Sequence, residues 1–491
     1  MTSQNLNKFS LPKHVHFIGI CGTGMSALAL AFHKKGIKVT GSDRGFYPPV
    51  STSLEQEGIS FYAGWHPEKM LENAMPDLVV VGTSSGSGNP ETKVAKEKGI
   101  EILSDAEVRG KFFAKENSIL AAGTWGKTTS TALLSHILKN LDKKPSYMIG
   151  GVPIDMDAAE LVTGPPAGGW SVIEADEYKS GPEDTKAKFD YIPVTHLLLS
   201  GVSWDHMDVY PTEDSYFVAF IRLIERVPKN GLVVACIDHP GVRRVLGHAR
   251  ARVVTYGKQP SADYQYVKIA QSPLGLRFGI VREREAYAIE SDLFGDFQAE
   301  NITGCFAMAR EIGLSPKEVL MAITDFKGIR RRLEKRFESK NVTVIDDIAH
   351  SPDKARATLR TLRAIYPSHK IIAVFEPNIG SRSAEAATKY TDAFSAADIV
   401  IIPQLTKLKI DPEAITKPLE GHDLTQLIAR GHSAVQYIPK DDKLVEQITS
   451  LAAGPLSESD EVVIVFLGSH SFRQMIEQVV EKLKVERAVT L

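Results

Sequence analysis

Residues 118–138 read SILAAGTWGKTTSTALLSHIL, a short apolar run and a longer helix-like run joined by a loop of glycine, threonine and lysine. A loop between a strand and a helix offers its backbone N–H groups to a phosphate chain. Lys127 can then meet the β- and γ-phosphate oxygens, and the Thr128 hydroxyl can ligate Mg²⁺. The loop is shorter than the usual Walker form, and a solvated surface lysine is the plain alternative. We predict an ATP- and Mg²⁺-binding loop formed by Gly123, Thr124, Gly126, Lys127, Thr128 and Thr129.

Short apolar runs alternate with helix-like runs on both sides of this loop, which predicts an α/β fold with parallel sheets covered on both faces. One series precedes the loop, a second begins with it, and a third begins at VTVIDDI, residues 342–348. The charged stretches RGKFFAKEN (109–117) and GIRRRLEKRFE (328–338) separate the series. We therefore expect three domains. They are a Rossmann-like domain over residues 1–113, a central P-loop-type ATPase domain over 114–332 and a second Rossmann-like domain over 333–491.

Composition excludes some classes of partner. Lysine and arginine total 58 against 60 acidic residues, a net charge of −2, so the basic bias of a nucleic-acid-binding protein is missing. No apolar stretch is long enough to cross a bilayer, and the N-terminus lacks the apolar core of a signal peptide. Cys21, Cys236 and Cys305 are far apart, without metal-type spacing. The three cysteines suggest reduced thiols in a cytoplasmic protein. From the charge balance and the lack of a long apolar stretch, we expect no binding to nucleic acid or to a membrane.

A second glycine-rich loop, FIGICGTGMSALA (17–29), lies near the N-terminus between a strand-like and a helix-like run. Gly19, Gly22 and Gly24 would allow the backbone to approach a diphosphate at the start of the helix. Asp43 ends the next strand, where dinucleotide enzymes place an acid that binds ribose. The spacing differs from G-x-G-x-x-G, so we favour a nucleotide diphosphate other than a nicotinamide cofactor. A nicotinamide oxidoreductase and a purely structural tight turn are the alternatives.

Two further strands end in groups that could hold a metal ion or polarise a phosphate. SVIEADEY places Glu174, Asp176 and Glu177 after one strand, and LLLSGVSWDHMDVY places Asp205, His206 and Asp208 after another. Buried acids are costly without a cation, and ligands gather at the carboxyl ends of parallel strands. We expect these groups to converge on the phosphate loop. A packed or surface histidine is the alternative for His206. Farther along the chain, the candidate residues are Asn301, Arg332, Asp346, Asp347 and His350.

Taken in order, these motifs resemble the Mur ligase family, ATP-dependent enzymes that add amino acids or peptides to a UDP-muramyl precursor of peptidoglycan. The resemblance rests on GICGTGMSALA, GTWGKTT, EADE, WDHMD, GDFQAEN, FKGIRRRLE and DDIAHSP, which span nearly the whole chain. It implies a carboxylate–amine ligase that acts through an acyl phosphate, with ATP and Mg²⁺ as cofactors. It also implies that the first domain binds the UDP-sugar, the central domain binds ATP, and the C-terminal domain holds the incoming amine or peptide. Phe220 stands where other branches carry a carbamylated lysine, so we expect no such group.

The resemblance also implies roles for individual residues. Gly19, Gly22, Gly24, Asp43, Ser84 and Asn89 correspond to the UDP-sugar site. Lys127 corresponds to the lysine on the β- and γ-phosphates, and the metal ligands are expected among Thr128, Glu174, Glu177 and His206, with the choice between the two glutamates open. Lys127, His206, Glu174 and Glu177 are the expected catalytic groups. Asn301, Arg332, Asp347 and His350 correspond to groups that contact the nucleotide.

The incoming amine is the least determined feature. The first loop and DDIAHSP indicate the branch that acts on UDP-N-acetylmuramate itself. FYPPVSTSLEQEGI, GNPE, MIGGVP and VIEADEY favour its murein peptide ligases, which attach a recycled L-alanyl-γ-D-glutamyl-meso-diaminopimelate, over its members that add L-alanine. Trp125, Phe297 and Ser351 depart from the family pattern. A catalytically degenerate protein that only binds a UDP-muramyl ligand is the alternative from another class.

Overall fold

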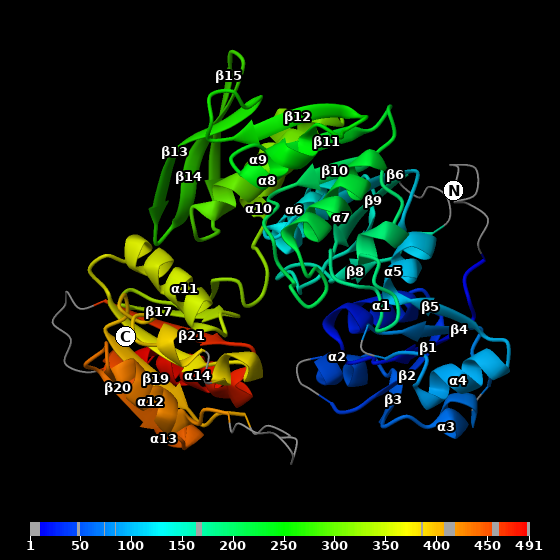
Figure 1. Cartoon of the computed structure of the whole chain (residues 1–491). Coiled ribbons are helices and arrows are strands. Elements are labelled where there is room, and N and C mark those ends of the chain that lie inside the picture. The colour runs from blue at the N-terminus through cyan, green and yellow to red at the C-terminus, as the bar shows by residue number, and fades with distance from the viewer. Residues whose placement is uncertain are drawn as a thin grey trace. The chain divides into compact units, whose positions relative to one another are not determined.

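The structure is a computed structural model of the whole chain. It describes residues 10–46, 50–72, 74–83, 85–163, 169–383, 386–406, 418–453 and 461–488. These residues form two compact units, of which the second consists of Gln271–Gly275, Leu293–Asp296 and Ile329–Leu491. Three separate sheets of five, ten and six strands underlie the two units (Figure 1). The expected α/β class with three sheet-containing regions is confirmed, whereas the domain boundaries near residues 113 and 333 stay predictions.

The first sheet is parallel, in the order β3-β2-β1-β4-β5. Its strands are β1 (His14–Ile18), β2 (Lys38–Asp43), β3 (Ser60–Ala63), β4 (Leu78–Val81) and β5 (Glu101–Ser104), and its helices are α1 (Thr23–His33), α2 (Val50–Gln56), α3 (Pro67–Glu72), α4 (Pro90–Glu97) and α5 (Asp105–Val108). The chain leaves β1 toward β2 on one side and returns to β4 on the other. The carboxyl end of β1 is therefore the switch point at which an open sheet of this type binds ligands.

The central sheet has the order β15-β14-β13-β12-β11-β10-β6-β9-β7-β8. Its strands are β6 (Asn117–Ala122), β7 (Ser146–Met148), β8 (Ala159–Glu160), β9 (Trp170–Ala175), β10 (His196–Leu199), β11 (Leu232–Cys236), β12 (Arg252–Gly257), β13 (Tyr264–Ser272), β14 (Gly275–Arg282) and β15 (Glu285–Ser291). Its helices are α6 (Lys127–Asn140), α7 (Glu213–Glu225), α8 (Pro240–Leu246), α9 (Phe297–Glu311) and α10 (Pro316–Asp325). Strand β6 pairs in parallel with both β9 and β10. The loops that follow these three strands therefore emerge side by side.

The first and central sheets share one apolar core, which explains why they form a single unit. Phe32 of α1 packs against Phe112 and Phe113, with ring centroids 5.4 and 6.3 Å apart. These phenylalanines lie in a short π-helical turn, Arg109–Phe113, that leads from α5 into β6. Burial of aromatic rings on both sides of this turn stabilises the junction through the hydrophobic effect. The glycine loop after β1 is held in this way on the same body as the phosphate loop after β6.

The third sheet belongs to the second unit and has the order β16-β17-β21-β18-β19-β20. Its strands are β16 (Glu334–Glu338), β17 (Val342–Asp347), β18 (Lys370–Glu376), β19 (Ile399–Pro403), β20 (Val435–Ile438) and β21 (Val462–Gly468), and its helices are α11 (Pro352–Ile365), α12 (Gly421–Ala429), α13 (Asp441–Ala453) and α14 (Met475–Ala488). Only β16 of this sheet pairs antiparallel. Among the described helices, none combines the length and apolar character that a membrane crossing requires.

Candidate active site

The phosphate loop follows the carboxyl end of β6 and leads directly into α6. Gly123 and Gly126 have φ angles of +134° and +78°, which residues with a Cβ rarely adopt. A Cβ at Gly126 would also overlap the amide oxygen of Asn301, so the loop needs glycine there for space as well as conformation. The Thr124 hydroxyl holds the loop from the other side, accepting from Ser203 N at 2.9 Å. The loop is thus pre-shaped around the N-terminus of α6, where a phosphate would find free N–H groups.

Lys127 forms a buried ion pair with Glu177. Its Nζ lies 2.9 and 3.0 Å from the two carboxylate oxygens, and the side chains are 14% and 1% exposed. His206 Nε2 lies 3.6 Å from the same carboxylate, and this contact raises the pKa of His206 above its ordinary value. Tyr210 donates its hydroxyl to Glu177 O at 2.6 Å and holds the backbone of this acid in place. Lys127, Glu177 and His206, expected from the sequence, are therefore brought together.

Glu174 contacts groups other than Lys127 and His206. Its carboxylate accepts the Thr128 hydroxyl at 3.1 Å and the backbone N–H of Gly150 at 2.7 Å. Burial raises the pKa of Glu174, because a charged carboxylate is poorly solvated there. Glu174 and Thr128 thus form one pair of oxygen ligands, and Glu177 and His206 form a second pair. The sequence could not separate the two glutamates, but their contacts do.

The remaining polar groups after β10 surround His206. The His206 backbone has a φ of +53°, and its N–H donates to the Asp205 side chain at 2.7 Å. The Tyr178 ring packs edge-on against the His206 ring at 5.1 Å, while its hydroxyl donates to Asp208 at 2.6 Å. Tyr178 therefore positions His206, a role not predicted for it although it directly follows the EADE motif.

The N-terminal glycine loop lines a cavity that also reaches the acids of the central sheet. This cavity has a volume of about 630 Å³, and its walls include Gly19, Gly22, Gly24, Glu174 and Asp176. All of these residues belong to the first unit. Volumes of this order are usual for small-molecule sites. The structure therefore connects the N-terminal glycine loop, through one space, to the acids that follow β9.

Charged side chains missed by the sequence analysis line the same cavity. Arg109 and Lys188 both contact the buried carboxylate of Asp105, at 2.7 and 3.2 Å. A Cβ at Gly24 would lie only 2.9 Å from the Arg109 guanidinium, so this glycine allows the cation to approach the loop. Lys188 also lies 3.8 Å from Asp176, so basic and acidic side chains meet on this wall, and Arg109 and Lys188 are the groups there that could contact an anionic ligand. Neither basic residue follows a strand directly, so the strand-end pattern could not reveal them.

The other residues expected at the UDP-sugar site have structural partners or lie outside the description. Asp43 ends β2, and its carboxylate accepts the N–H groups of Cys21 and Arg44 at 2.9 and 2.7 Å. It stabilises the turn of the glycine loop through these bonds. Asn89 caps α4 by accepting the N–H groups of Glu91 and Thr92. Ser84 lies outside the residues that the structure describes.

Helix α9 brings Asn301 to the phosphate loop. The Asn301 amide nitrogen donates to Gln298 at 3.1 Å, and its oxygen faces Gly126. Phe297, which departs from the family pattern, begins the helix with half of its side chain exposed. Trp125, the other departure in this region, lies against Gly201 and packs edge-on against His239 at 4.9 Å.

The second unit groups three of its expected residues. Burial raises the pKa of Asp347 and lowers the pKa of His350, and the exposed Arg332 lies close enough to interact with both electrostatically. The Asp347 carboxylate accepts from Leu333 N at 2.8 Å and from Ala349 N at 2.9 Å, so it fixes the local backbone. Asp346 instead contacts Arg331 and Arg336, and Ser351 caps α11. Arg332 belongs to the second unit, and the phosphate loop belongs to the first.

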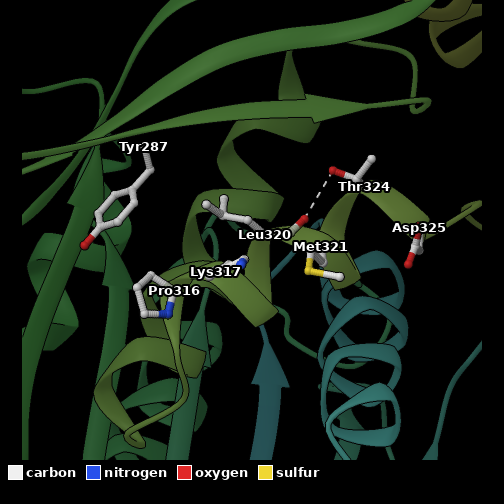
Figure 2. A pocket seen from close by; sticks show the side chains of 7 residues that line it. All are labelled: Tyr287, Pro316, Lys317, Leu320, Met321, Thr324 and Asp325. Atoms are coloured by element: carbon white, nitrogen blue, oxygen red, sulfur yellow. Dashed lines mark hydrogen bonds between the residues drawn. The ribbon is translucent and has the colours of Figure 1, made fainter.

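A second hollow, shown in Figure 2, lies between α10 and β15. Pro316, Leu320 and Met321 give it an apolar wall, with Lys317 and Asp325 as its charged residues. The Thr324 hydroxyl is directed to the Leu320 carbonyl in the same helix. The hollow contains no residue of either glycine loop and none of the acids after β9. It is therefore separate from the candidate active site.

Comparison with known proteins shows to which family the chain belongs. Residues 14–117 match the Mur ligase family catalytic domain, residues 121–309 the Mur ligase middle domain, and residues 331–470 the Mur ligase glutamate ligase domain. The chain belongs to the Mur ligase family. It is an ATP-dependent carboxylate–amine ligase, as members of this family are.

Two sequence relatives that align over most of the chain carry the same name. UDP-N-acetylmuramate–L-alanine ligases of Methylobacterium radiotolerans and Rhodopseudomonas palustris are 31% and 32% identical, over 89% and 90% of this chain and 92% and 93% of theirs. The solved UDP-N-acetylmuramate–alanine ligase of Thermotoga maritima has a TM-score of 0.75 at 23% identity, covering 97% of this chain and all of that one. At that identity the structural likeness supports the fold alone.

These relatives correct the prediction of a murein peptide ligase. The correction has a physical basis in the location of the stretches that favoured that branch. GNPE, MIGGVP and VIEADEY all lie in the first unit, with the UDP-sugar and phosphate loops, whereas the amine was expected on the C-terminal region. Both kinds of ligase act on UDP-N-acetylmuramate. Resemblance in the region expected to bind that shared substrate therefore carries little information about the incoming amine.

Proposed function

We propose that this Mur ligase joins L-alanine to the carboxylate of UDP-N-acetylmuramate, with cleavage of ATP to ADP and phosphate. The names of the full-length relatives support L-alanine as the amine. The observation that carries the proposal is the cavity that joins the glycine loop after β1 to the acids after β9. A UDP-sugar bound by its diphosphate at the first loop would extend toward the phosphate loop in this space. Its carboxylate would then approach the γ-phosphate of ATP.

The chemical character of the donors fits ATP with Mg²⁺. Thr128 and Glu174 offer hard oxygen ligands 3.1 Å apart, and Glu177 and His206 offer a second set. When bound, Mg²⁺ would neutralise charge on the phosphate oxygens. Glu174 is almost fully buried with a raised pKa, so a nearby cation would relieve the cost of its charge. We assign Lys127 to the β- and γ-phosphate oxygens and Asn301 to the nucleotide.

Lys127 is held ready for this role. Its ammonium group now faces Glu177, and it would turn part of its hydrogen-bonding capacity to the nucleotide when phosphate arrives. Glu177 would remain paired with His206, so the acid is not left isolated in the interior. Charge that develops on the transferring phosphoryl group would be stabilised by groups already in position, which lowers the activation barrier more than mobile groups could.

The reaction then follows from the placement of the substrates. A carboxylate oxygen of the muramate attacks the γ-phosphorus, and ADP leaves. The amine of L-alanine attacks the resulting acyl phosphate at its carbonyl carbon, and phosphate leaves with the oxygen that came from the carboxylate. Water must be excluded while the acyl phosphate exists. Arg332, Asp347 and His350 are predicted to contact the nucleotide. The protein is also predicted to be cytoplasmic.

The test measures product and phosphate together. Purified protein is incubated with ATP, Mg²⁺ and UDP-N-acetylmuramate, in parallel with L-alanine and with the tripeptide, and each product is identified by its mass. We expect phosphate release and an alanyl product with L-alanine. Turnover with the tripeptide alone would contradict the proposal. Binding of UDP-N-acetylmuramate without turnover of either amine would favour the degenerate binding protein.

A further inference from the structure

Three side chains with metal-ligating atoms meet beside the active site, on elements far apart in the sequence. Cys236 ends β11, His239 caps the start of α8, and Glu300 lies on α9. Their ligand atoms all lie within 4.8 Å of one another. His239 Nε2 and a Glu300 carboxylate oxygen are 2.9 Å apart. None of the three was assigned a role in the ligase reaction.

The set matches the preferences of a borderline-soft metal. A tetrahedral Zn²⁺ bound to sulfur, nitrogen and oxygen places its ligand atoms about 3.3–3.6 Å apart, given usual bond lengths of about 2.0–2.3 Å. The His239–Glu300 pair must open by a few tenths of an ångström, and the other separations, which are at most 4.8 Å, must close by no more than about 1.5 Å. Both movements are within the reach of side-chain rotation.

We propose that Cys236, His239 and Glu300 form a binding site for a thiophilic divalent metal ion such as Zn²⁺, and that its occupation weakens nucleotide binding. Three protein ligands leave the fourth position of the ion open to water. The hydroxyl of Tyr256 is buried and has no hydrogen-bond partner among the described residues. It lies near enough to Cys236 and Glu300 to interact with both electrostatically. It can serve as a partner for a water on the ion.

Burial and proton chemistry set the selectivity and pH dependence of this site. Cys236 is fully buried, and its thiol must lose its proton to bind a metal ion. The ion must displace this proton, and its apparent affinity therefore rises with pH. Mg²⁺ prefers oxygen ligands and does not repay the deprotonation of a thiol. The site should thus ignore the Mg²⁺ that the ligase reaction needs.

Two contacts link the cluster to the phosphate loop. The His239 ring packs on Trp125, which belongs to that loop. Glu300 precedes Asn301, whose amide oxygen faces Gly126. An ion that moves His239 and Glu300 would disturb both contacts. This link to nucleotide rests on the proposed function, whereas the metal site itself does not.

The metal site is tested on the full chain after removal of bound metal by a chelator. Co²⁺ and Cd²⁺ are titrated in while the thiolate-to-metal absorption in the near ultraviolet is recorded. We expect a band that saturates at one equivalent, and that grows more steeply at higher pH. Cys236→Ser should abolish the band, and Glu300→Gln should weaken metal binding at least about tenfold.

Cys305→Ser is the matched control, because the Cys305 thiol is equally buried and donates to the Ser130 carbonyl at 3.5 Å, outside the cluster of Cys236, His239 and Glu300. It should keep the band. Thermal unfolding of each variant establishes that it is folded, and Glu300→Gln keeps the test decisive where Cys236→Ser does not fold. No band in the unmodified protein, or a band that survives Cys236→Ser, would overturn the site.

The effect on nucleotide is measured separately, by calorimetric titration of a non-hydrolysable ATP analogue with and without Zn²⁺. We expect Zn²⁺ to weaken its binding on the order of tenfold, a typical size for coupling between neighbouring sites. The effect should vanish in Cys236→Ser and persist in Cys305→Ser. Equal affinity with and without Zn²⁺ would refute the coupling. Absence of analogue binding under any condition would instead count against the proposed function.

Discussion

Replacement of Lys127 by alanine should separate its role in stability from its role in catalysis. The variant would leave Glu177, which is 1% exposed, without its cation, and only His206 at 3.6 Å would remain as a partner. Loss of one partner from a buried ion pair costs about 3–5 kcal/mol. We expect about 3 kcal/mol, the lower end, because His206 can take a proton and compensate in part. The double variant Lys127→Ala/Glu177→Gln should recover most of this loss, since no isolated charge remains.

Activity should not follow stability in this series. Both variants lack the cation that stabilises charge on the phosphoryl group, and removal of one such group costs about 10²–10³-fold in kcat. Denaturant unfolding gives the free energies, and phosphate release gives kcat. Lys139→Ala is the control, since Lys139 lies on the same helix but is half exposed and pairs with Glu160 at the surface. Near-normal kcat in Lys127→Ala, or recovery of kcat in the double variant, would refute the assignment of Lys127 to ATP.

Two further variants test the acids. Glu174→Gln should raise the Mg²⁺ concentration needed for half-maximal phosphate release while leaving the unfolding temperature unchanged or higher. The buried amide carries no charge, its oxygen can still accept the Gly150 N–H, and its NH₂ group can donate to the Thr128 hydroxyl. The surface variant Glu160→Gln is the control, and an unchanged Mg²⁺ requirement would mean that Glu174 is structural. Burial raises the pKa of Asp346 to about 6, so its contribution to stability is complete below about pH 4 and is lost as the pH rises through 6, a loss of about 3 kcal/mol. Asp346→Asn should remove this fall in the free energy of unfolding between about pH 4 and pH 6, whereas the exposed control Asp353→Asn should keep it.

Much of the site follows from the order of strands and loops in the sequence. In an open parallel sheet the carboxyl ends of neighbouring strands meet, so the motifs after β6, β9 and β10 had to converge once these strands were recognised. The same rule placed the glycine loop after β1 at a switch point. Buried strands of this kind are continuous apolar runs, which makes them visible without a structure.

Other features could not be predicted from the sequence, for physical reasons. The apolar runs do not predict β14 and β15, because this antiparallel pair carries charged and exposed residues such as Arg277 and Glu290. The local sequence also does not show which neighbour each acid contacts, so the roles of Glu174 and Glu177 could not be distinguished by their spacing. Arg109 and Glu300 reach their sites from helical segments that do not follow a strand motif. Resemblance at the shared UDP-sugar end led to the wrong amine.

In the proposed reaction, ATP held at the phosphate loop activates the muramate carboxylate as an acyl phosphate before L-alanine attacks. The most direct measurement uses UDP-N-acetylmuramate whose carboxylate carries a heavy isotope of oxygen, incubated with ATP, Mg²⁺ and L-alanine. Mass spectrometry of the released phosphate then reports where the carboxylate oxygen went. We predict one labelled oxygen in the phosphate and one in the new amide. Unlabelled phosphate, or label carried by AMP, would contradict the account.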